Sequence, residues 1–309
     1  MWNKLGLVFD SAKHANQQWF CNSALTPQPF RLNDTTIRVF AGFRDIEGVS
    51  RIGYVDLASC DPTRILEVSE RPVLDIGRDG CFDDNGIIMG DVVQTPAGIY
   101  LFYVGFQLVK KAKFLAFSGA ALSEDGGETF VRISESPILE RDRFQSTIGA
   151  IHTARYENGI WRLWFARGDG WELINGVPYP QYHICYAETK DLLNIPRSGV
   201  PCVNAMSPEY RIGRPKVYQV ADGSYVMYAT KGTISGEYTP SFFRSEDGIK
   251  WERDDASLGI APSENGWDSE TLCYPALIKN AGQTLMIYNG NKMGVNGFGA
   301  AVGSDVILA

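Results

Sequence analysis

Five carboxylates stand where they could donate or accept protons. A general acid and a general base must reach the same reacting group, so acids that share one end of a set of strands are candidates for this chemistry. Aspartates in glycine-rich turns are also common backbone caps, and Arg44 beside Asp45 could form a plain surface ion pair. A carboxylate inside an apolar strand pattern needs a partner. The candidate catalytic acids are Asp45, Asp84, Asp91, Asp268 and Glu270.

A second set of side chains could hold the anionic part of a ligand. Arginine binds carboxylate or phosphate groups through a rigid fork of donors. Histidine titrates near neutral pH, so His152 could be an acid, a base or a phosphate contact, and a purely structural role also fits. The candidate substrate-binding residues are His152, Arg167, Arg211, Arg214, Trp171 and Asn289.

These residues occur at matching places in a fivefold repeat. The repeat is anchored on the second strand of a predicted hairpin, and its equivalent residues are separated by 63, 62, 64 and 59 positions: Arg38, Leu101, Leu163, Met227 and Met286. Each anchor follows a polar turn and an apolar first strand. Repeated units of four short strands are typical of β-propellers. The sequence therefore predicts an all-β, five-bladed propeller with four-stranded antiparallel blades, forming a single domain over residues 1–309. The predicted first strands are Ala24–Leu32, Ile87–Thr95, Ala150–Glu157, Ile212–Val220 and Leu272–Ile278.

The N-terminal run Leu5–Phe9 has no hairpin partner of its own. The last repeat has almost no chain left after its third predicted strand, Phe298–Val302, and so lacks a fourth. An open ring of sheets would leave unpaired edges. We therefore expect the N-terminal strand to complete the last blade and close the ring.

Two turns share the pattern Ser-Glu-Asp-Gly, in Ser123–Phe130 and Ser245–Trp251. They resemble the Asp-box turn of sialidase-type propellers, in which an acid caps free amides and an aromatic side chain plugs the blade edge. We interpret both copies as structural.

The composition narrows the classes of function. Hydrophobic residues make up 44% and charged residues 21% of the chain, as in folded globular proteins. The net charge of −7 and the absence of a basic run argue against nucleic acid and against an anionic membrane as partners. Six scattered cysteines suggest neither a disulfide framework nor a zinc site. The N-terminus lacks the features of a secretory signal and no apolar window reaches membrane-spanning length, so we expect a cytoplasmic protein with no membrane insertion, metal or cofactor.

The repeats and several motifs resemble the five-bladed propeller superfamily of arabinanases, β-xylosidases, invertases, levansucrases and mannoside phosphorylases. More narrowly, the chain is similar to glycosidase-related proteins found with bacterial surface-polysaccharide biosynthesis, and to the propeller domain of glucosamine inositolphosphorylceramide transferases. The motifs that carry the resemblance are Phe43-Arg44-Asp45, Ser50–Tyr54, Phe82–Gly86, Gly266–Glu270, Tyr274-Pro275 and Tyr288–Asn291.

The resemblance implies a catalytic triad that this chain carries only in part. Hydrolases of the superfamily place acids on the first three inner strands, and glycoside hydrolysis needs two carboxyl groups at a fixed separation. The second repeat can supply Asp84 or Asp91, whereas the first inner strand has no acid and the third offers His152 instead of a glutamate. A hydrolase rebuilt from Asp45, Asp91 and Glu270 is one hypothesis.

We expect a carbohydrate-active enzyme that binds a glycoside or a phosphate- or nucleotide-linked sugar in an axial pocket. The alternative is a glycan- or nucleotide-sugar-binding propeller without catalysis, because the triad is degenerate. A pure interaction scaffold is a third possibility. A strongly raised pKa on one pocket carboxyl group would favour the enzyme, and ion-paired or solvated acids would favour the binding protein. The oligomeric state is left open.

Overall fold

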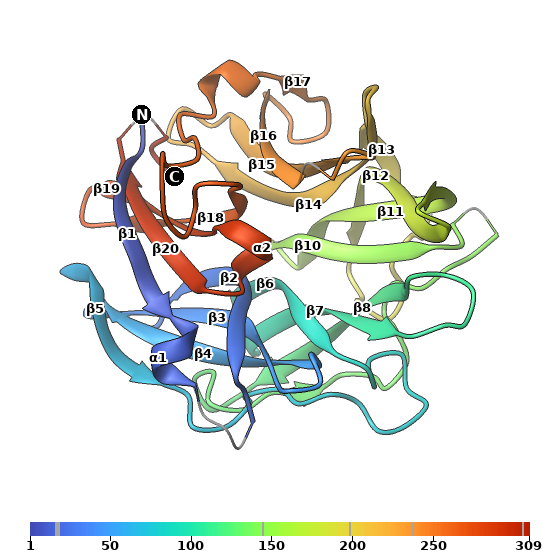
Figure 1. The fold of residues 1–309 in the computed structure, drawn as a ribbon, viewed down its shortest axis with the longest axis horizontal. Coiled ribbons are helices and arrows are strands. Elements are labelled where there is room, and N and C mark those ends of the chain that lie inside the picture. Colours follow the sequence, from blue (N-terminus) through green and yellow to red (C-terminus); the bar gives the residue numbers. More distant parts are fainter. Residues whose placement is uncertain (16–18, 144, 198, 237, 305) are drawn as a thin grey trace. The chain divides into compact units, whose positions relative to one another are not determined.

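The computed structural model describes residues 1–15, 19–143, 145–197, 199–236, 238–304 and 306–309. The described chain is built almost entirely of β-strands and forms two compact units (Figure 1). Unit 1 comprises Met1–Leu74, Val217–Tyr228 and Tyr238–Ala309, and unit 2 comprises Asp75–Lys216 and Ala229–Glu237. No helix among the described residues has both the length and the apolar character needed to span a bilayer.

Unit 1 contains two four-stranded sheets. One has the order β2-β3-β4-β5 and the other has the order β1-β20-β19-β18. In the second sheet β1 pairs antiparallel with β20, which confirms that the N-terminal strand completes the last sheet (Figure 1). The strands are β2 (Asn22–Arg31), β3 (Thr36–Arg44), β4 (Ser50–Ala58), β5 (Asp61–Val68), β1 (Asn3–Asp10), β18 (Cys273–Asn280), β19 (Gln283–Asn289) and β20 (Gly297–Gly303).

Unit 1 also contains a short hairpin, three short helices and the segment Val217–Tyr228. The hairpin pairs β16 (Tyr238–Ser245) with β17 (Glu252–Arg253), and the helices are α1 (Ser11–His14), the 3₁₀ helix η1 (Asp255–Ser257) and α2 (Asn291–Gly294). A core of fully buried aromatic and aliphatic side chains, including Phe9, Phe43 and Phe298, packs between the sheets of this unit.

Unit 2 is built on two antiparallel groups of strands. The first is β6-β7-β8 with β9 added to β8, and the second is β10-β11-β12 with β13 added to β12. Trp161, Phe102 and Phe165 lie in the core of this unit. The strands are β6 (Ile87–Thr95), β7 (Gly98–Gln107), β8 (Leu115–Ser123), β9 (Val131–Arg132), β10 (Ile148–Glu157), β11 (Ile160–Ile174), β12 (Val177–Thr189) and β13 (Val200–Val203). The boundary between the units crosses β14 (Glu209–Gln219) and β15 (Tyr225–Thr233).

The first strands of four repeats are interrupted at corresponding places. The pairing register shifts by one residue in β6, β10 and β18, and twice in β2, as in a β-bulge. The break falls at Gly90 and His152, or at a non-glycine residue with a left-handed φ that precedes proline: Thr26 (50°), Arg214 (53°) and Tyr274 (56°). These five positions are separated by 64, 62, 62 and 60 residues, which matches the repeat predicted from the sequence.

Candidate functional site

A buried ion pair holds the strand breaks of unit 2 together. The ammonium group of Lys216 on β14 donates to the carbonyl oxygen of Gly90 at 2.5 Å and lies 3.5 Å from Oδ1 of Asp91. Asp91 also accepts hydrogen bonds from the amides of Val92 (3.0 Å) and Ala154 (2.9 Å). The predicted need for a partner at Asp91 is confirmed, and three inner strands meet at this carboxylate.

Gly90 makes this close approach possible. A Cβ atom at this position would lie 2.4 Å from the carbonyl oxygen of Ile151, so only glycine fits between β6 and β10. On the other side of β10, the hydroxyl group of Thr153 donates to the carbonyl oxygen of Pro215 at 2.7 Å. Hydrogen bonds thus join β6 to β10 and both of these strands to β14.

Burial changes the proton affinity of each charged group in this cluster. It raises the pKa of Asp91 and lowers the pKa of Lys216, and the attraction between the two opposes both shifts. Burial lowers the pKa of His152 well below its usual value, and the positive charges of Arg214 and Lys216 lower it further. His152 is therefore neutral at neutral pH, and the cluster carries two cations and one carboxylate.

A second group of polar side chains forms a row across β11, β12, β14 and β15 of unit 2, which we call the cationic row. Arg167 on β11 lies opposite His183 on β12 in the strand register, and the next residue, Tyr182, pairs with Arg211 on β14. The Arg211 guanidinium lies 5.8 Å from the ring centre of Tyr182 and 4.8 Å from that of Tyr210.

The cationic row continues to β15 through an ion pair. Nζ of Lys231 lies 4.0 Å from Oε1 of Glu209, whose side chain is 7% exposed. The row therefore comprises residues at one level of four strands: Arg167, His183, Tyr182, Arg211, Glu209 and Lys231. Because neighbouring residues of a strand face opposite sides, Arg167 and His183 lie on one face of the strands, and Tyr182 and Arg211 lie on the other. Burial and then the charge of Arg167 lower the pKa of His183, whereas Asp169 opposes this shift. Burial raises the pKa of Tyr210 to about 12, so its hydroxyl group stays protonated.

A buried hydroxyl group lies beside this row. Thr147 is fully buried, and its Oγ1 has no hydrogen-bond partner among the residues that the structure describes. It lies against Gly168, the residue after Arg167, where an added Cβ would be 2.8 Å from it. A buried hydroxyl group without a partner lowers stability.

Arg167 and Arg211 were named as candidates from the sequence, but Glu209, His183 and Lys231 were not. A signal was present in the repeat. Aligning the second strands places Arg167 and Lys231 at the position occupied by Gly42, Gly105 and Gly290 in the other repeats. Comparing this column would have indicated that cations gather on the third and fourth repeats.

Three of the predicted acids lie in unit 1. Asp45 accepts hydrogen bonds from the amides of Glu47 and Val49 and pairs with Arg51 at 2.6 Å. Burial alone would raise its pKa, but these donors keep the pKa lowered. Asp45 thus caps its own turn.

Asp268 and Glu270 differ in their surroundings although they are two residues apart. Asp268 is buried and accepts from Nζ of Lys4 at 2.7 Å and from the hydroxyl of Tyr288 at 3.1 Å. Asp268 thereby links β1, which carries Lys4, to β19, which carries Tyr288. Glu270 is exposed.

Asn289, predicted to bind substrate, is fully buried in unit 1. Both polar atoms of its side chain form hydrogen bonds with the backbone. Its Oδ1 accepts from the amide of Thr26 at 2.9 Å, and its Nδ2 donates to the carbonyls of Ala24 (2.9 Å) and Gly297 (2.8 Å). The amide group thereby fixes the strand break of β2.

The remaining predicted residues lie in unit 2. Asp84 accepts from the amide of Gly80 at 2.9 Å within its own turn. Asp83, its neighbour, is buried and pairs with Arg132 at 2.8 Å. Trp171 lies on the part of β11 beyond the cationic row and is partly exposed. Among the described residues, no group of three or more His, Cys, Asp or Glu side chains could hold a metal ion.

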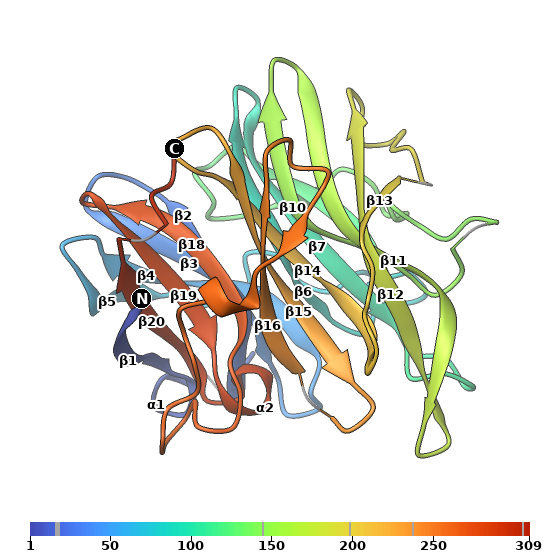
Figure 2. The same cartoon turned by 90° about the horizontal axis from the view of Figure 1, so that it is seen from above.

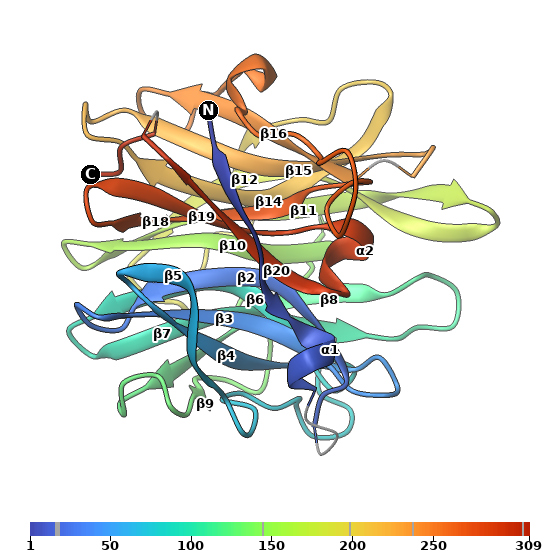
Figure 3. The ribbon, with the colours of Figure 1, turned by 60° about the vertical axis from the view of Figure 1, so that its left-hand side comes forward.

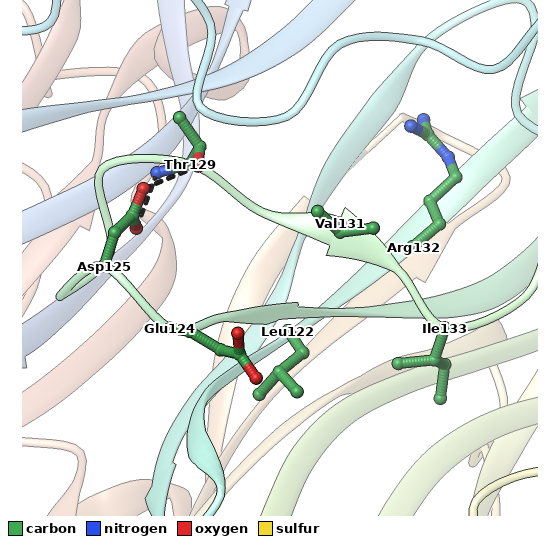
Figure 4. Close-up of a pocket in the computed structure, with 7 residues that line it drawn as sticks. All are labelled: Leu122, Glu124, Asp125, Thr129, Val131, Arg132 and Ile133. Atoms are coloured by element: carbon green, nitrogen blue, oxygen red, sulfur yellow. Dashed lines mark hydrogen bonds between the residues drawn. The ribbon is translucent and has the colours of Figure 1, made fainter.

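A hollow of about 590 Å³ at the edge of β8 and β9 lies next to the first Asp-box turn (Figure 4). Asp125 accepts from the amides of Glu128 and Thr129 and from the Thr129 hydroxyl. Asp247 accepts from the amides of Ile249 and Lys250 in the second copy. The capping role interpreted from the sequence is confirmed, and the hollow contains no residue of the cationic row.

The chain was compared with protein families, with other sequences and with solved structures. No family model matches the chain. It is 28% identical over 306 residues to the uncharacterized protein Rv1502 of Mycobacterium tuberculosis, covering 97% of this chain and 98% of that protein. Among solved structures it resembles a glycoside hydrolase with a TM-score of 0.75 at 16% identity, covering 99% of this chain and 93% of the other. The chain has the all-β propeller fold of glycosidases.

A second solved structure carries a more specific description. It belongs to the GH130 family of mannoside phosphorylases, which contains glycoside hydrolases that target β-1,2 mannosidic linkages in Candida mannan. The TM-score is 0.69 at 13% identity, covering 99% of this chain and 94% of the other. The four-stranded sheets of this protein are therefore blades of a glycosidase-like propeller.

Proposed function

We propose that this protein binds, and acts on, a sugar that carries an anionic group such as a phosphate or a nucleotide diphosphate. The observation that carries the proposal is the cationic row of unit 2. It places Arg167, Arg211 and Lys231 on neighbouring strands, where the carboxylate of Glu209 pairs with Lys231 and those of Asp169 and Glu172 act on His183 and Tyr210. Arginine forks suit a phosphate or carboxylate better than a neutral glycan.

Each member of the row has a distinct task in this proposal. The arginine forks hold the anionic oxygens, and the ring of Tyr182 offers an apolar face for the sugar. Glu209 is the carboxyl group that can give or take a proton at the glycosidic oxygen. The likeness to mannoside phosphorylases supports the proposal, because phosphorolysis needs a bound phosphate.

The proposal also covers the domain organisation and the biological role of the protein. The recurrence of the strand break at five nearly equal spacings supports five blades in one propeller domain over residues 1–309. A role in bacterial surface-glycan metabolism rests on the sequence resemblance.

A second candidate function is glycan binding without catalysis. It is favoured by the state of the predicted acids, since Asp45, Asp84 and Asp268 are each engaged by a turn or an ion pair. Burial raises the pKa of Asp91, but both of its oxygens are hydrogen-bonded. In this case Glu209 would serve only its own turn, where it accepts a hydrogen bond from the amide of Met206 at 3.1 Å, and the ion pair with Lys231.

A thermal-shift screen against free sugars, sugar phosphates and nucleotide sugars tests the proposal. A ligand present at about 100 times its Kd should add about 2.7 kcal/mol of stability. We expect hits among the anionic sugars that are lost in Arg211→Ala and kept in Arg78→Ala, whose side chain is exposed and paired with Glu135. Hits confined to neutral oligosaccharides would contradict the proposal.

Product formation then separates the enzyme from the binding protein. Each hit is incubated with the protein, with and without an acceptor or phosphate, and the products are analysed by chromatography. An enzyme should turn the hit over, and Glu209→Gln should abolish turnover while leaving binding within a few fold. Absence of product from every hit would favour the binding protein.

A further inference from the structure

The strands β11 and β12 continue beyond the cationic row as a two-stranded hairpin. Its register pairs Trp171 with Pro180 and Leu173 with Pro178. Because side chains alternate between the faces of a strand pair, these four apolar residues share one face. Leu173 is 66% exposed. The opposite face is polar and includes Glu172 and Gln181, which are joined by a hydrogen bond of 2.9 Å.

The turn between β7 and β8 lies against this hairpin. The backbone amide of Lys113 donates to the carbonyl oxygen of Pro178, the register partner of Leu173, at 3.0 Å. Figure 3 shows the β7–β8 turn and the β11–β12 hairpin projecting toward the same side, and Figure 2 shows the length of β11 and β12.

The β7–β8 turn is apolar at its start and basic afterwards. Leu108 is 67% exposed, and Val109 is exposed beside it. Lys110, Lys111 and Lys113 follow and are all exposed, and residues 107–114 contain no acid. The protruding apolar side chains and the lysines together form a surface that we call the ridge: Leu108, Lys110, Lys111, Lys113, Trp171 and Leu173.

We propose that the ridge binds the surface of an anionic lipid membrane. Leucine and tryptophan side chains insert between lipid headgroups, while lysines beside them approach the anionic phosphates. Each basic residue near such a surface contributes a factor of about five in affinity. The lysines of this turn are a local group of cations in a chain of net charge −7. At physiological salt the acids elsewhere on the chain are screened beyond about 8 Å.

The shape and charge of the ridge favour a membrane over a protein partner. A stable protein interface buries about 800 Å² on each side, which requires a broad complementary surface. The ridge instead offers a few apolar side chains on two projecting turns. A twofold contact between copies would bring the same three lysines together, and like charges would repel.

The location of the ridge connects it with the candidate site. Arg167 of the cationic row and Trp171 of the ridge are four residues apart on β11. A ridge at the membrane would therefore present the row to sugars linked to lipid phosphates. The membrane inference stands without the proposed function, because membrane binding is measured with no sugar present.

Flotation with vesicles tests the inference. The full-length protein is mixed with phosphatidylcholine vesicles that contain or lack phosphatidylglycerol. We expect binding to the anionic vesicles only, weakened by added salt. Lys110→Ala with Lys111→Ala should weaken binding about 25-fold, and Leu173→Glu with Leu108→Glu should abolish it. The matched controls Lys190→Ala with Lys250→Ala, and Leu193→Glu, alter exposed residues elsewhere and should bind like the wild type.

Three outcomes would overturn the inference. One is failure of the wild type to bind anionic vesicles. Another is binding that survives Leu173→Glu with Leu108→Glu, which would indicate a general attraction of polyanions. The third is a dimer, seen by light scattering, that these same substitutions convert to a monomer, because a second copy would then cover the ridge. Circular dichroism confirms that each variant is folded.

Discussion

In unit 1 the strand break of β2 is held by the neutral amide of Asn289, whereas in unit 2 the break of β6 is held by the buried ion pair of Asp91 and Lys216. Both arrangements lie at a register shift of a first strand. The neutral amide shows that the fold does not require charges at this place. A buried ion pair often contributes less to stability than well-packed apolar groups would. Charges retained in unit 2 therefore indicate a role beyond stability.

The largest effect should come from breaking the ion pair of unit 2. Lys216→Met leaves the carboxylate of Asp91 buried without its cation, and this should lower the free energy of unfolding by about 3 to 5 kcal/mol. Urea unfolding measures the loss. The double variant Asp91→Leu, Lys216→Met removes both charges and should recover most of the stability. A double variant no more stable than Lys216→Met would contradict the comparison.

The neutral counterpart in unit 1 should cost less. Asn289→Ala leaves the amide of Thr26 and the carbonyls of Ala24 and Gly297 without their partner, and should cost about 2 to 3 kcal/mol. Binding of an anionic sugar to the folded fraction should be unchanged. Reduced affinity in that fraction would return Asn289 to the set of ligand-binding residues.

The dependence of stability on pH should reveal the buried histidine of unit 2. Because the folded-state pKa of His152 lies below its unfolded value of about 6.5, the unfolded state binds more protons in acid. Stability is therefore present above pH 6.5 and falls as the pH drops, by at most about 1.4 kcal/mol per pH unit for this group. His152→Gln should flatten the profile. Equal profiles for the wild type and His152→Gln would count against this account.

The smallest effect is expected at Asp45 in unit 1. Asp45→Asn keeps an oxygen for the turn amides and loses only the partly exposed ion pair with Arg51, so it should cost less than about 1 kcal/mol. Turnover or ligand affinity should stay at the wild-type value. A loss of activity without a loss of stability would restore the catalytic role predicted for Asp45.

The sequence predicted the repeats because they depend on local patterns. Hairpins, turn residues and the pairing of the N-terminal strand follow from spacing and from the avoidance of open edges. It could also indicate that Asp91 needs a partner. It could not identify Lys216, which is 125 residues away, or Lys4, which is 264 residues from Asp268. Such partners are set by how distant strands meet, and no local pattern records that meeting.

The central claim is that the cationic row of unit 2 binds the anionic group of a sugar, and calorimetric titration tests it most directly. The ligands are a sugar phosphate identified by the thermal-shift screen and the same sugar without its phosphate, each titrated into the wild type, Arg211→Gln and Arg78→Gln. We predict that the phosphorylated sugar binds the wild type and Arg78→Gln alike, and binds Arg211→Gln at least about tenfold more weakly, because a hydrogen bond to a charged group contributes about 1.5 to 3 kcal/mol. Equal affinity for both sugars, or no change in Arg211→Gln, would contradict the claim.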